Sequence, residues 1–326
     1  MKKILITGGA GFVGRRFTKY FLDKKHLVIV VDNVAKLTGG LDPNKWPLFS
    51  PYDYKNFKFY KQDCRNWFKK NNDKEFDYVL HLAAMVGGRE IIENNPLAVS
   101  DDLSIDSHYW QWAKTNKPKK TLCFSSSACY PVNLQKKNKY RLLKETDINL
   151  EKNISLPDLT YGWAKLTCEY LAKIAYEKHG LKSVCYRPFS GYGEDQDLNY
   201  PFPSICLRAI KNKGNNTFKV WGTGNQMRDF IYIEDCVNAV IKTMDKIDNA
   251  EALNLSNGVF TSFKDFAKKA CSLVGYSPKV FGTSNKPEGV FARAGDTKKQ
   301  KKYGVSNKVN FIDGIRIALK YLEKKL

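Results

Sequence analysis

Short hydrophobic runs alternate with polar segments along the first half of the chain, and the first thirty-two residues set the pattern. Residues 2–7 form a β-prone run, and residues 27–31 are continuously apolar. Four glycines lie between positions 8 and 14, and residues 15–24 carry apolar side chains at helical spacing. We therefore predict a strand, a glycine-rich turn, a helix and a second strand that is buried on both faces.

The same alternation continues to about residue 190. Further strands are predicted at residues 57–61, 78–82, 122–126 and 183–187, with helices near residues 66–71, 99–115 and 161–179. Strands that alternate with helices are typical of an α/β fold with a doubly wound parallel sheet.

The pattern changes after residue 190. Glycine, proline and aromatic residues become more frequent there, and the regular alternation fades. We predict a first domain over residues 1–189 and a smaller C-terminal lobe over residues 190–326. A segment near residues 230–246 is expected to return to the first domain.

Composition limits the class of protein. Hydrophobic residues make up 43% of the 326-residue chain, which is enough for a sizeable core. No apolar run approaches the roughly 20 residues that a spanning helix needs, and the N-terminal run is too short for a signal peptide. We expect a cytoplasmic protein that does not bind a membrane.

The charge is strongly positive. Lysine and arginine number 54 against 33 acidic residues, for a formal net charge of +21. Such a charge fits either an anionic partner or a lysine-rich surface. The lysines are scattered along the whole chain, and no zinc-finger or RNA-binding aromatic signature is present. We expect attraction for anions as a side effect, and no nucleic acid as partner.

Eight cysteines are present, and no two of them have C-x-x-C spacing. In a cytoplasmic protein this pattern predicts free, mostly buried thiols. No metal site is expected.

The glycines at positions 9, 11 and 14 match the Gly-x-Gly-x-x-Gly pattern of a Rossmann dinucleotide site. Their context fits, because a predicted strand precedes them and a helix follows, whose N-terminus favours a pyrophosphate. Asp32 ends the next strand and would accept hydrogen bonds from both adenosine ribose hydroxyls. Its charge would repel a 2′-phosphate, so the sequence predicts NAD as the cofactor.

A catalytic group is predicted on the helix at residues 161–179. Tyr161 and Lys165 lie four residues apart and therefore share a helix face. The ammonium would stabilise a phenolate, which makes the tyrosine a general base for an alcohol proton. Ser127 lies just beyond the strand at residues 122–126 and would hydrogen-bond the reacting oxygen alongside Tyr161.

With these motifs the sequence resembles the extended short-chain dehydrogenase/reductase family, in its nucleotide-sugar epimerase and dehydratase branch. The resemblance covers nearly the whole chain. It is carried by Thr7-Gly8-x-x-Gly11-x-x-Gly14, Asp32, Asp63, His81-Leu82-Ala83-Ala84, Ser125-Ser126-Ser127, Tyr161-x-x-x-Lys165, Arg187-Pro188 and Gly222-x-Gly224-x-Gln226-x-Arg228-Asp229-Phe230.

The resemblance implies two sets of binding residues. In this family Asp63 would hold the adenine amino group, and Arg228 would bind the substrate diphosphate, with Arg293 as a second candidate. The implied cofactor-binding set is Gly8, Gly11, Phe12, Val13, Gly14, Asp32, Asn33, Asp63, Cys64, Leu82, Ala83, Ala84, Met85, Tyr161, Lys165 and Pro188. The implied substrate-binding set is Gly88, Ser190, Arg228 and Arg293.

The residues around Cys129 bear on the reaction. Ala128 and Cys129 stand where 4,6-dehydratases carry Asp-Glu, which argues against a standard dehydratase. The segment Ser126-Ser127-Ala128-Cys129 is similar to one in GDP-mannose 3,5-epimerase and GDP-fucose synthase, whose cysteine removes a proton beside a C4 ketone. Cys129 is therefore a candidate acid/base at C3 or C5, although the adjoining loop is one residue shorter here and the second proton carrier of those enzymes is missing. The alternative is that Cys129 only packs.

Our leading hypothesis is an NAD-dependent nucleotide-sugar epimerase that acts through a transient C4-keto sugar. Tyr161 would remove the C4-hydroxyl proton, and the keto sugar would be re-reduced on its other face or epimerised next to C4 by Cys129. One alternative is a 4-dehydrogenase or atypical 4,6-dehydratase that releases a keto sugar. Another is a non-catalytic NAD-binding protein. The resemblance also implies a homodimer. The base, the sugar and the carbon that is inverted stay open.

Overall fold

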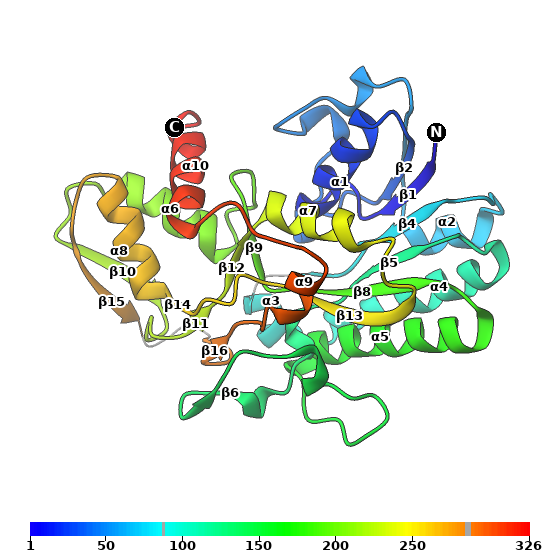
Figure 1. The fold of residues 1–326 in the computed structure, drawn as a ribbon. Helices are drawn as coiled ribbons and strands as arrows, with labels where there is room; N and C mark the ends of the chain where they lie inside the picture. Colours follow the sequence, from blue (N-terminus) through cyan, green and yellow to red (C-terminus); the bar gives the residue numbers. More distant parts are fainter. Residues whose placement is uncertain (87–88, 284–287) are drawn as a thin grey trace.

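Seven parallel strands form the centre of the protein, in the order β13-β8-β5-β4-β1-β2-β3 (Figure 1). The computed structural model describes residues 1–86, 89–283 and 288–326. The strands are β1 (Lys3–Thr7), β2 (Leu27–Asp32), β3 (Phe57–Lys61), β4 (Tyr78–His81), β5 (Thr121–Phe124), β8 (Ser183–Pro188) and β13 (Asn249–Leu255).

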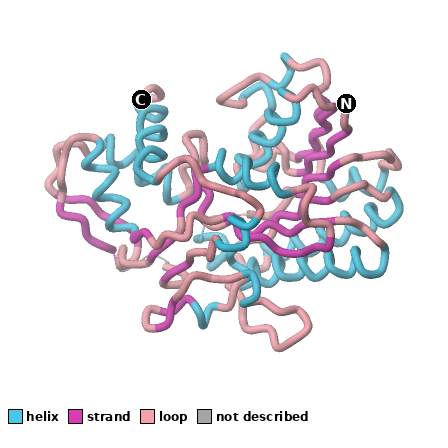
Figure 2. The backbone as a smooth tube through the Cα atoms, in the orientation of Figure 1, coloured by secondary structure: helices cyan, strands magenta, loops and turns pink. Residues whose placement is uncertain are grey.

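Helices cover both faces of this sheet (Figure 2). The helices associated with it are α1 (Phe12–Asp23), α2 (Cys64–Lys70), α4 (Asp101–Asn116), α5 (Leu159–His179) and α7 (Ile233–Thr243). Alternate residues of each strand face opposite layers. Ile4 and Ile6 pack into the core that contains Phe17 of α1, whereas Leu5 packs into the core that contains Trp112 of α4.

The strand order places a crevice at the carboxyl ends of β1 and β4. The chain runs outward from β1 through β2 and β3 and then returns to the other side of β1 as β4. At such a reversal, the connections that follow the two strands diverge and leave room for a ligand.

The predicted α/β fold with a doubly wound parallel sheet is confirmed. The six strands predicted in residues 1–189 are all present, with ends within two residues of the prediction. The sequence analysis missed β13, whose sequence Asn-Ala-Glu-Ala-Leu-Asn-Leu lacks a continuous apolar run. Its pairing with β8 is interrupted after Asn249, where Ala250 has φ 61°. An irregular strand of this kind has no clear sequence period.

The remaining elements form the smaller lobe and its junction with the sheet. An aromatic cluster fills the lobe, in which the rings of Phe230 and Phe311 stack at 4.8 Å and those of Phe202 and Phe266 at 5.1 Å. The elements are α3 (Arg89–Asn94), β6 (Gln135–Lys136), β7 (Lys139–Tyr140), β9 (Ser190–Tyr192), α6 (Pro201–Lys211), β10 (Thr217–Trp221), β11 (Met227–Arg228), β12 (Phe230–Tyr232), β14 (Thr261–Ser262), α8 (Phe263–Leu273), β15 (Lys279–Thr283), β16 (Ala292–Arg293), α9 (Lys298–Lys302) and α10 (Phe311–Glu323).

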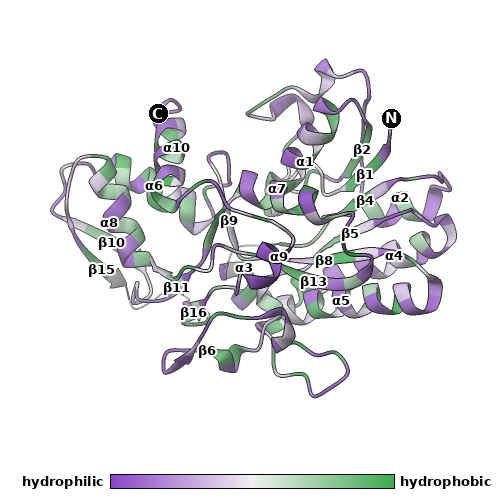
Figure 3. Ribbon diagram, in the orientation of Figure 1, coloured by the Kyte–Doolittle hydropathy of each residue, from purple (hydrophilic) through white to green (hydrophobic). Residues whose placement is uncertain are grey.

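Hydrophobic residues concentrate inside these layers, and the short helix α9 is strongly hydrophilic (Figure 3). The buried hydrophobic residues include long stretches of β1, β2 and β4. None of the helices in the described ranges is both long and apolar enough to cross a lipid bilayer.

Candidate functional site

One cavity of about 880 Å³ lies at the carboxyl edge of the sheet and extends to the lobe. It reaches from Asp32 at the end of β2 to Tyr161 and Lys165 on α5, and on to Arg228 and Arg293 on β11 and β16. All of the residues that the sequence analysis assigned to the cofactor line this cavity, and so do three of the four assigned to the substrate. The fourth, Gly88, lies outside the described residues.

The glycine turn and α1 form one end of the cavity. Gly11 is the N-cap of α1, no side chain caps this helix end, and its first turn holds no acidic residue. A Cβ on Gly11 would meet only the carbonyl oxygen of Gly8, at 3.3 Å, and would otherwise enter open space. Free N–H groups and an unobstructed backbone are what a pyrophosphate requires at a helix N-terminus.

Asp32 lies beside this turn with its carboxylate fixed. Its two oxygens accept hydrogen bonds from the N–H groups of Ala10 at 3.0 Å and Val34 at 2.7 Å. Burial raises the pKa of Asp32, and these two N–H groups act against that rise. Each oxygen keeps a further lone pair for a ribose hydroxyl. The turn, the open helix end and this carboxylate therefore fit NAD.

Asp63 lines the adenine end, but its carboxylate is already engaged. It caps α2 by accepting from the N–H of Arg65 at 2.8 Å, and it forms an ion pair with the Arg65 guanidinium at 2.7 Å. Hydrogen bonding to Arg65 lowers the pKa of Asp63. An adenine amino group would therefore meet a carboxylate that Arg65 holds in place.

Tyr161 and Lys165 share one face of α5 inside the cavity. The Lys165 ammonium lies 5.7 Å from the centre of the Tyr161 ring. Burial raises the pKa of Tyr161, and the Lys165 charge lowers it. The helix comes close to the segment after β5 because residue 162 is glycine: a Cβ there would lie 2.5 Å from the Ala128 carbonyl oxygen.

Ser126 is the nearer candidate partner of Tyr161. Burial raises the pKa of Tyr161 most, and the Ser126 side chain acts against that rise with a smaller contribution than the Lys165 charge. The Ser126 Oγ also accepts from the N–H of Ala128 at 3.1 Å, so it keeps its own O–H for donation. The predicted partner, Ser127, is the next residue and begins a short 3₁₀ turn. Both serines are buried and neither lines the cavity, so the role of Ser127 stays a prediction.

Cys129 does not line the cavity. Its thiol is buried, donates to the Ser126 carbonyl oxygen at 2.7 Å, and lies 3.6 Å from Glu169 Oε1. Glu169 is itself paired with the buried guanidinium of Arg187 at 2.6 Å. Burial raises the pKa of Cys129, and the Glu169 charge adds to the rise. This placement favours a packing role for Cys129 over the predicted acid–base role.

Two arginines lie side by side on the lobe wall of the cavity. β11 pairs in parallel with β16, and this register places Arg228 opposite Arg293. The buried carboxylate of Asp229 stabilises this region by accepting hydrogen bonds from the N–H groups of Asn257 at 3.1 Å and Gly258 at 2.9 Å. The pairing of these two strands thus holds the two predicted substrate arginines next to each other.

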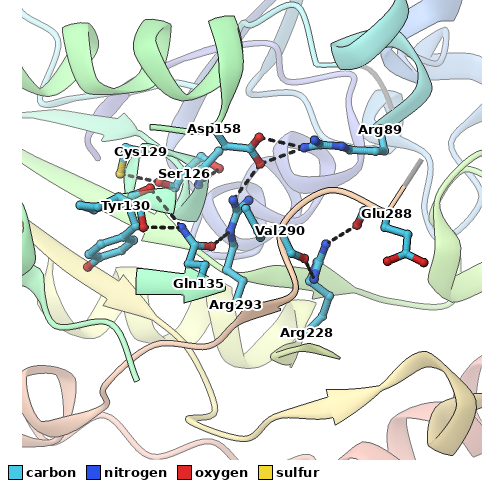
Figure 4. A network of polar contacts seen from close by, with 12 residues as sticks. Arg89, Ser126, Cys129, Tyr130, Gln135, Asp158, Arg228, Glu288, Val290 and Arg293 are labelled. Carbon is cyan, nitrogen blue, oxygen red and sulfur yellow. Dashed lines mark hydrogen bonds and ion pairs between the residues drawn. The ribbon is translucent and has the colours of Figure 1, made fainter. Parts of the chain in front are cut away.

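A third arginine, which the sequence analysis missed, joins them. Arg89 donates to both oxygens of Asp158 at 2.9 Å, and Arg293 donates to one of the same oxygens at 2.7 Å (Figure 4). Arg228 donates instead to the carbonyl oxygens of Val290 and Glu288. Burial lowers the pKa of Arg228 to about 9, and Arg293 and Arg89 add to this effect. Arg89 also forms an ion pair with Glu93 at 2.5 Å, so it is paired with two carboxylates. Arg228 forms no ion pair among the described residues, and its charge is therefore the one that an anion could pair with.

A model of the NAD dependent epimerase/dehydratase family matches residues 4–256. GDP-L-fucose synthase 1 of Arabidopsis thaliana is 26% identical to this chain over 250 residues, which cover 73% of this chain and 74% of that protein. GDP-L-colitose synthase of Yersinia pseudotuberculosis is 22% identical over 328 residues, which cover 98% and 97%. The crystal structure of a UDP-glucose 4-epimerase from Thermus thermophilus in complex with NAD has the same fold, with a TM-score of 0.82, 20% identity and coverage of 99% and 100%.

Substitution of Gly11 tests whether the NAD pyrophosphate binds at the glycine turn. We expect Gly11→Ala to weaken NAD binding by about tenfold or more, because the added methyl group would occupy the space that a pyrophosphate needs. Isothermal titration calorimetry with NAD measures the change. The unfolding midpoint in urea serves as the control and should stay close to that of the wild type, because the methyl group meets little protein. Unchanged NAD affinity in a folded variant would place the pyrophosphate elsewhere.

Proposed function

Because the chain belongs to the NAD-dependent epimerase/dehydratase family, we propose that it is a nucleotide-sugar 4-epimerase that inverts C4 through a transient 4-keto sugar. The observation that carries this proposal is one continuous cavity. It extends from the cofactor end at Asp32 past Tyr161 to Arg228 and Arg293, which we call the arginine wall. Cys129 is 1% exposed, and its thiol donates to the Ser126 carbonyl oxygen beside the Glu169 carboxylate; this supports inversion at C4 over inversion at C3 or C5.

In the proposed reaction, this chain supplies the proton transfers and the positioning. NAD, held by the glycine turn and Asp32, would supply a hydride acceptor and donor for C4. Tyr161 takes the proton of the C4 hydroxyl and gives it back to the new hydroxyl group. Lys165 would stabilise the phenolate by its charge, and Ser126 would stabilise it by a hydrogen bond. Return of the hydride to the other face of the ketone inverts the centre.

The arginine wall would hold the substrate diphosphate. Guanidinium groups bind phosphate oxygens in pairs, and Arg228 and Arg293 present theirs from adjacent strands. We propose that residues 190–326 contribute most of the substrate-binding lobe, whereas residues 1–189 hold the cofactor. The base of the nucleotide would extend past the arginines.

Isotope labelling tests the proposed reaction. The protein is incubated in D2O with NAD and a panel of GDP-, UDP-, dTDP- and CDP-sugars, and the products are read by mass spectrometry and NMR. We expect inversion at C4 of at least one sugar, without deuterium at C3 or C5, because the hydride is carried internally and no carbon-bound proton exchanges. Cys129→Ala is the matched control and should give the same labelling pattern.

Other results of this experiment contradict the proposal in distinct ways. Deuterium at C3 or C5 that disappears in Cys129→Ala would make the cysteine an acid–base group. Loss of water would identify an atypical dehydratase, and a keto sugar formed together with stoichiometric NADH would identify a 4-dehydrogenase. Tight NAD binding without turnover of any sugar would favour a non-catalytic protein.

The two serines offer a paired test. We expect Ser126→Ala to lower kcat by about 100-fold, because it removes a hydrogen-bond donor to the Tyr161 phenolate. Ser127→Ala should stay within about threefold of the wild type, because the hydrogen bond that lowers the pKa of Tyr161 comes from its neighbour. Steady-state kinetics on the sugar found by the labelling panel measures both. A larger loss of kcat in Ser127→Ala than in Ser126→Ala would support the sequence-based prediction that Ser127 is the hydrogen-bonding serine.

We propose that the protein is a homodimer that associates through α4 and α5. These helices pack side by side, and their outer faces expose Leu103, Trp163 and Tyr170. Tyr170→Glu should convert the dimer to monomer in sedimentation velocity, because it would bury a charge in the interface. Tyr52→Glu, at a comparably exposed site away from these helices, is the control and should leave the dimer intact. A monomeric wild type would contradict the proposal.

We also propose a cytoplasmic location. All eight cysteines are free and buried in the structure. Unpaired thiols in this number are typical of proteins from a reducing compartment.

A further inference from the structure

A buried carboxylate on α4 faces the Tyr161–Lys165 pair, and no role has yet been assigned to it. Asp102 lies in the first turn of α4 and is 1% exposed. Its Oδ2 lies 3.3 Å from the Lys165 Nζ, and its Oδ1 accepts a hydrogen bond from the N–H of Met85. Met85 lines the cavity, so Asp102 connects a cavity-lining segment after β4 to the catalytic helix.

Lys165 needs such a partner because it is almost fully buried. Its side chain is 6% exposed, and an isolated ammonium at this depth would be strongly destabilised. Burial alone would lower the pKa of Lys165, but the Asp102 carboxylate contributes most to raising it above the ordinary value. The lysine therefore keeps its charge across the range in which an enzyme works.

Other polar groups also surround the pair. Asp106, one turn further along α4, contributes less to the pKa of Lys165 than Asp102 does, and its own carboxylate contacts His81 Nε2 at 3.1 Å. The titratable and polar groups that act on the pair from the packed elements are Asp102 and Asp106 on α4, Cys168 on α5, Ser126 and Cys129 after β5, and Tyr200 before α6. Asp102 is the only one of these groups in the described structure that forms an ion pair with Lys165.

We propose that Asp102 is a positioning residue that holds the Lys165 ammonium between α4 and α5 and moderates its pull on the Tyr161 hydroxyl proton. The proposal rests on the proposed function in assigning the base to Tyr161. Lys165 favours the phenolate, and the carboxylate behind it opposes that effect. The balance of these two charges sets the pH at which the base becomes available.

The effects of the two charges on the pKa of Tyr161 agree with this geometry. The Lys165 charge lowers the pKa of Tyr161, and the Asp102 charge raises it. Removal of the carboxylate charge while the ammonium stays protonated therefore leaves the phenolate better stabilised. The expected sign is a lower pKa of Tyr161 and a base that forms at lower pH.

A titration of Tyr161 that needs no substrate tests this sign. The NAD-loaded full chain is labelled with carbon-13 at the Cζ of tyrosine, and Tyr161→Phe identifies the resonance. We expect the titration midpoint of Tyr161 to fall by about one pH unit in Asp102→Asn. Asp106→Asn is the matched control, because it removes a carboxylate from the next turn of the same helix, and it should shift the midpoint much less.

The outcomes separate this proposal from the proposed function. An unchanged or higher midpoint in folded Asp102→Asn overturns the role of Asp102, whether or not the protein turns over a sugar. If Asp102→Asn does not fold, Asp102→Ser leaves room for a water beside the ammonium and should show the same direction of shift. With a turned-over sugar, the acid limb of kcat/KM should move to lower pH by the same amount, and a fixed limb contradicts the proposal. Failure of the sugar panel with a shifted midpoint would count against the proposed function alone.

Discussion

The parallel run of the seven strands is the constraint from which the site follows. Since every strand points the same way, the residues that end β1, β2, β4, β5 and β8 all meet at one edge of the sheet. Asp32 and Pro188 reach the cavity only because they end such strands. The helices then bring Tyr161 and Lys165 to the same edge. No local motif could assemble these groups without the common strand direction.

Much of this arrangement could be predicted from the sequence, because it depends on local patterns. Glycine spacing, an acidic strand end and the Tyr161–Lys165 spacing of four indicated residues that the structure brings together along one cavity. The omissions concern side chains whose role depends on tertiary contacts. Ser126 and Ser127 are neighbours of the same residue type, so a local pattern cannot choose between them. Asp102 and Arg89 carried no sequence signal, because their partners, Lys165 and Asp158, lie more than sixty residues away.

The positive charge of the protein has two separate physical meanings. Most of the lysines are scattered over the surface, where solvent and salt screen their charges. Arg228 and Arg293 line a cavity, and Arg89 shares the Asp158 carboxylate with Arg293. Screening is weaker there, so the charges of Arg293 and Arg89 act on Arg228. The net charge of +21 therefore does not indicate the ligand, whereas the arginines at the cavity indicate that it is an anion.

Asp158, which pairs with Arg89 and Arg293, also begins the catalytic helix as its N-cap. Only two residues, Leu159 and Thr160, lie between it and Tyr161. The ion pairs of Asp158 thus connect Arg89 and Arg293 to the start of the helix that carries Tyr161. In the proposed reaction, this short connection would relate the position of the substrate diphosphate to that of the group that acts on C4.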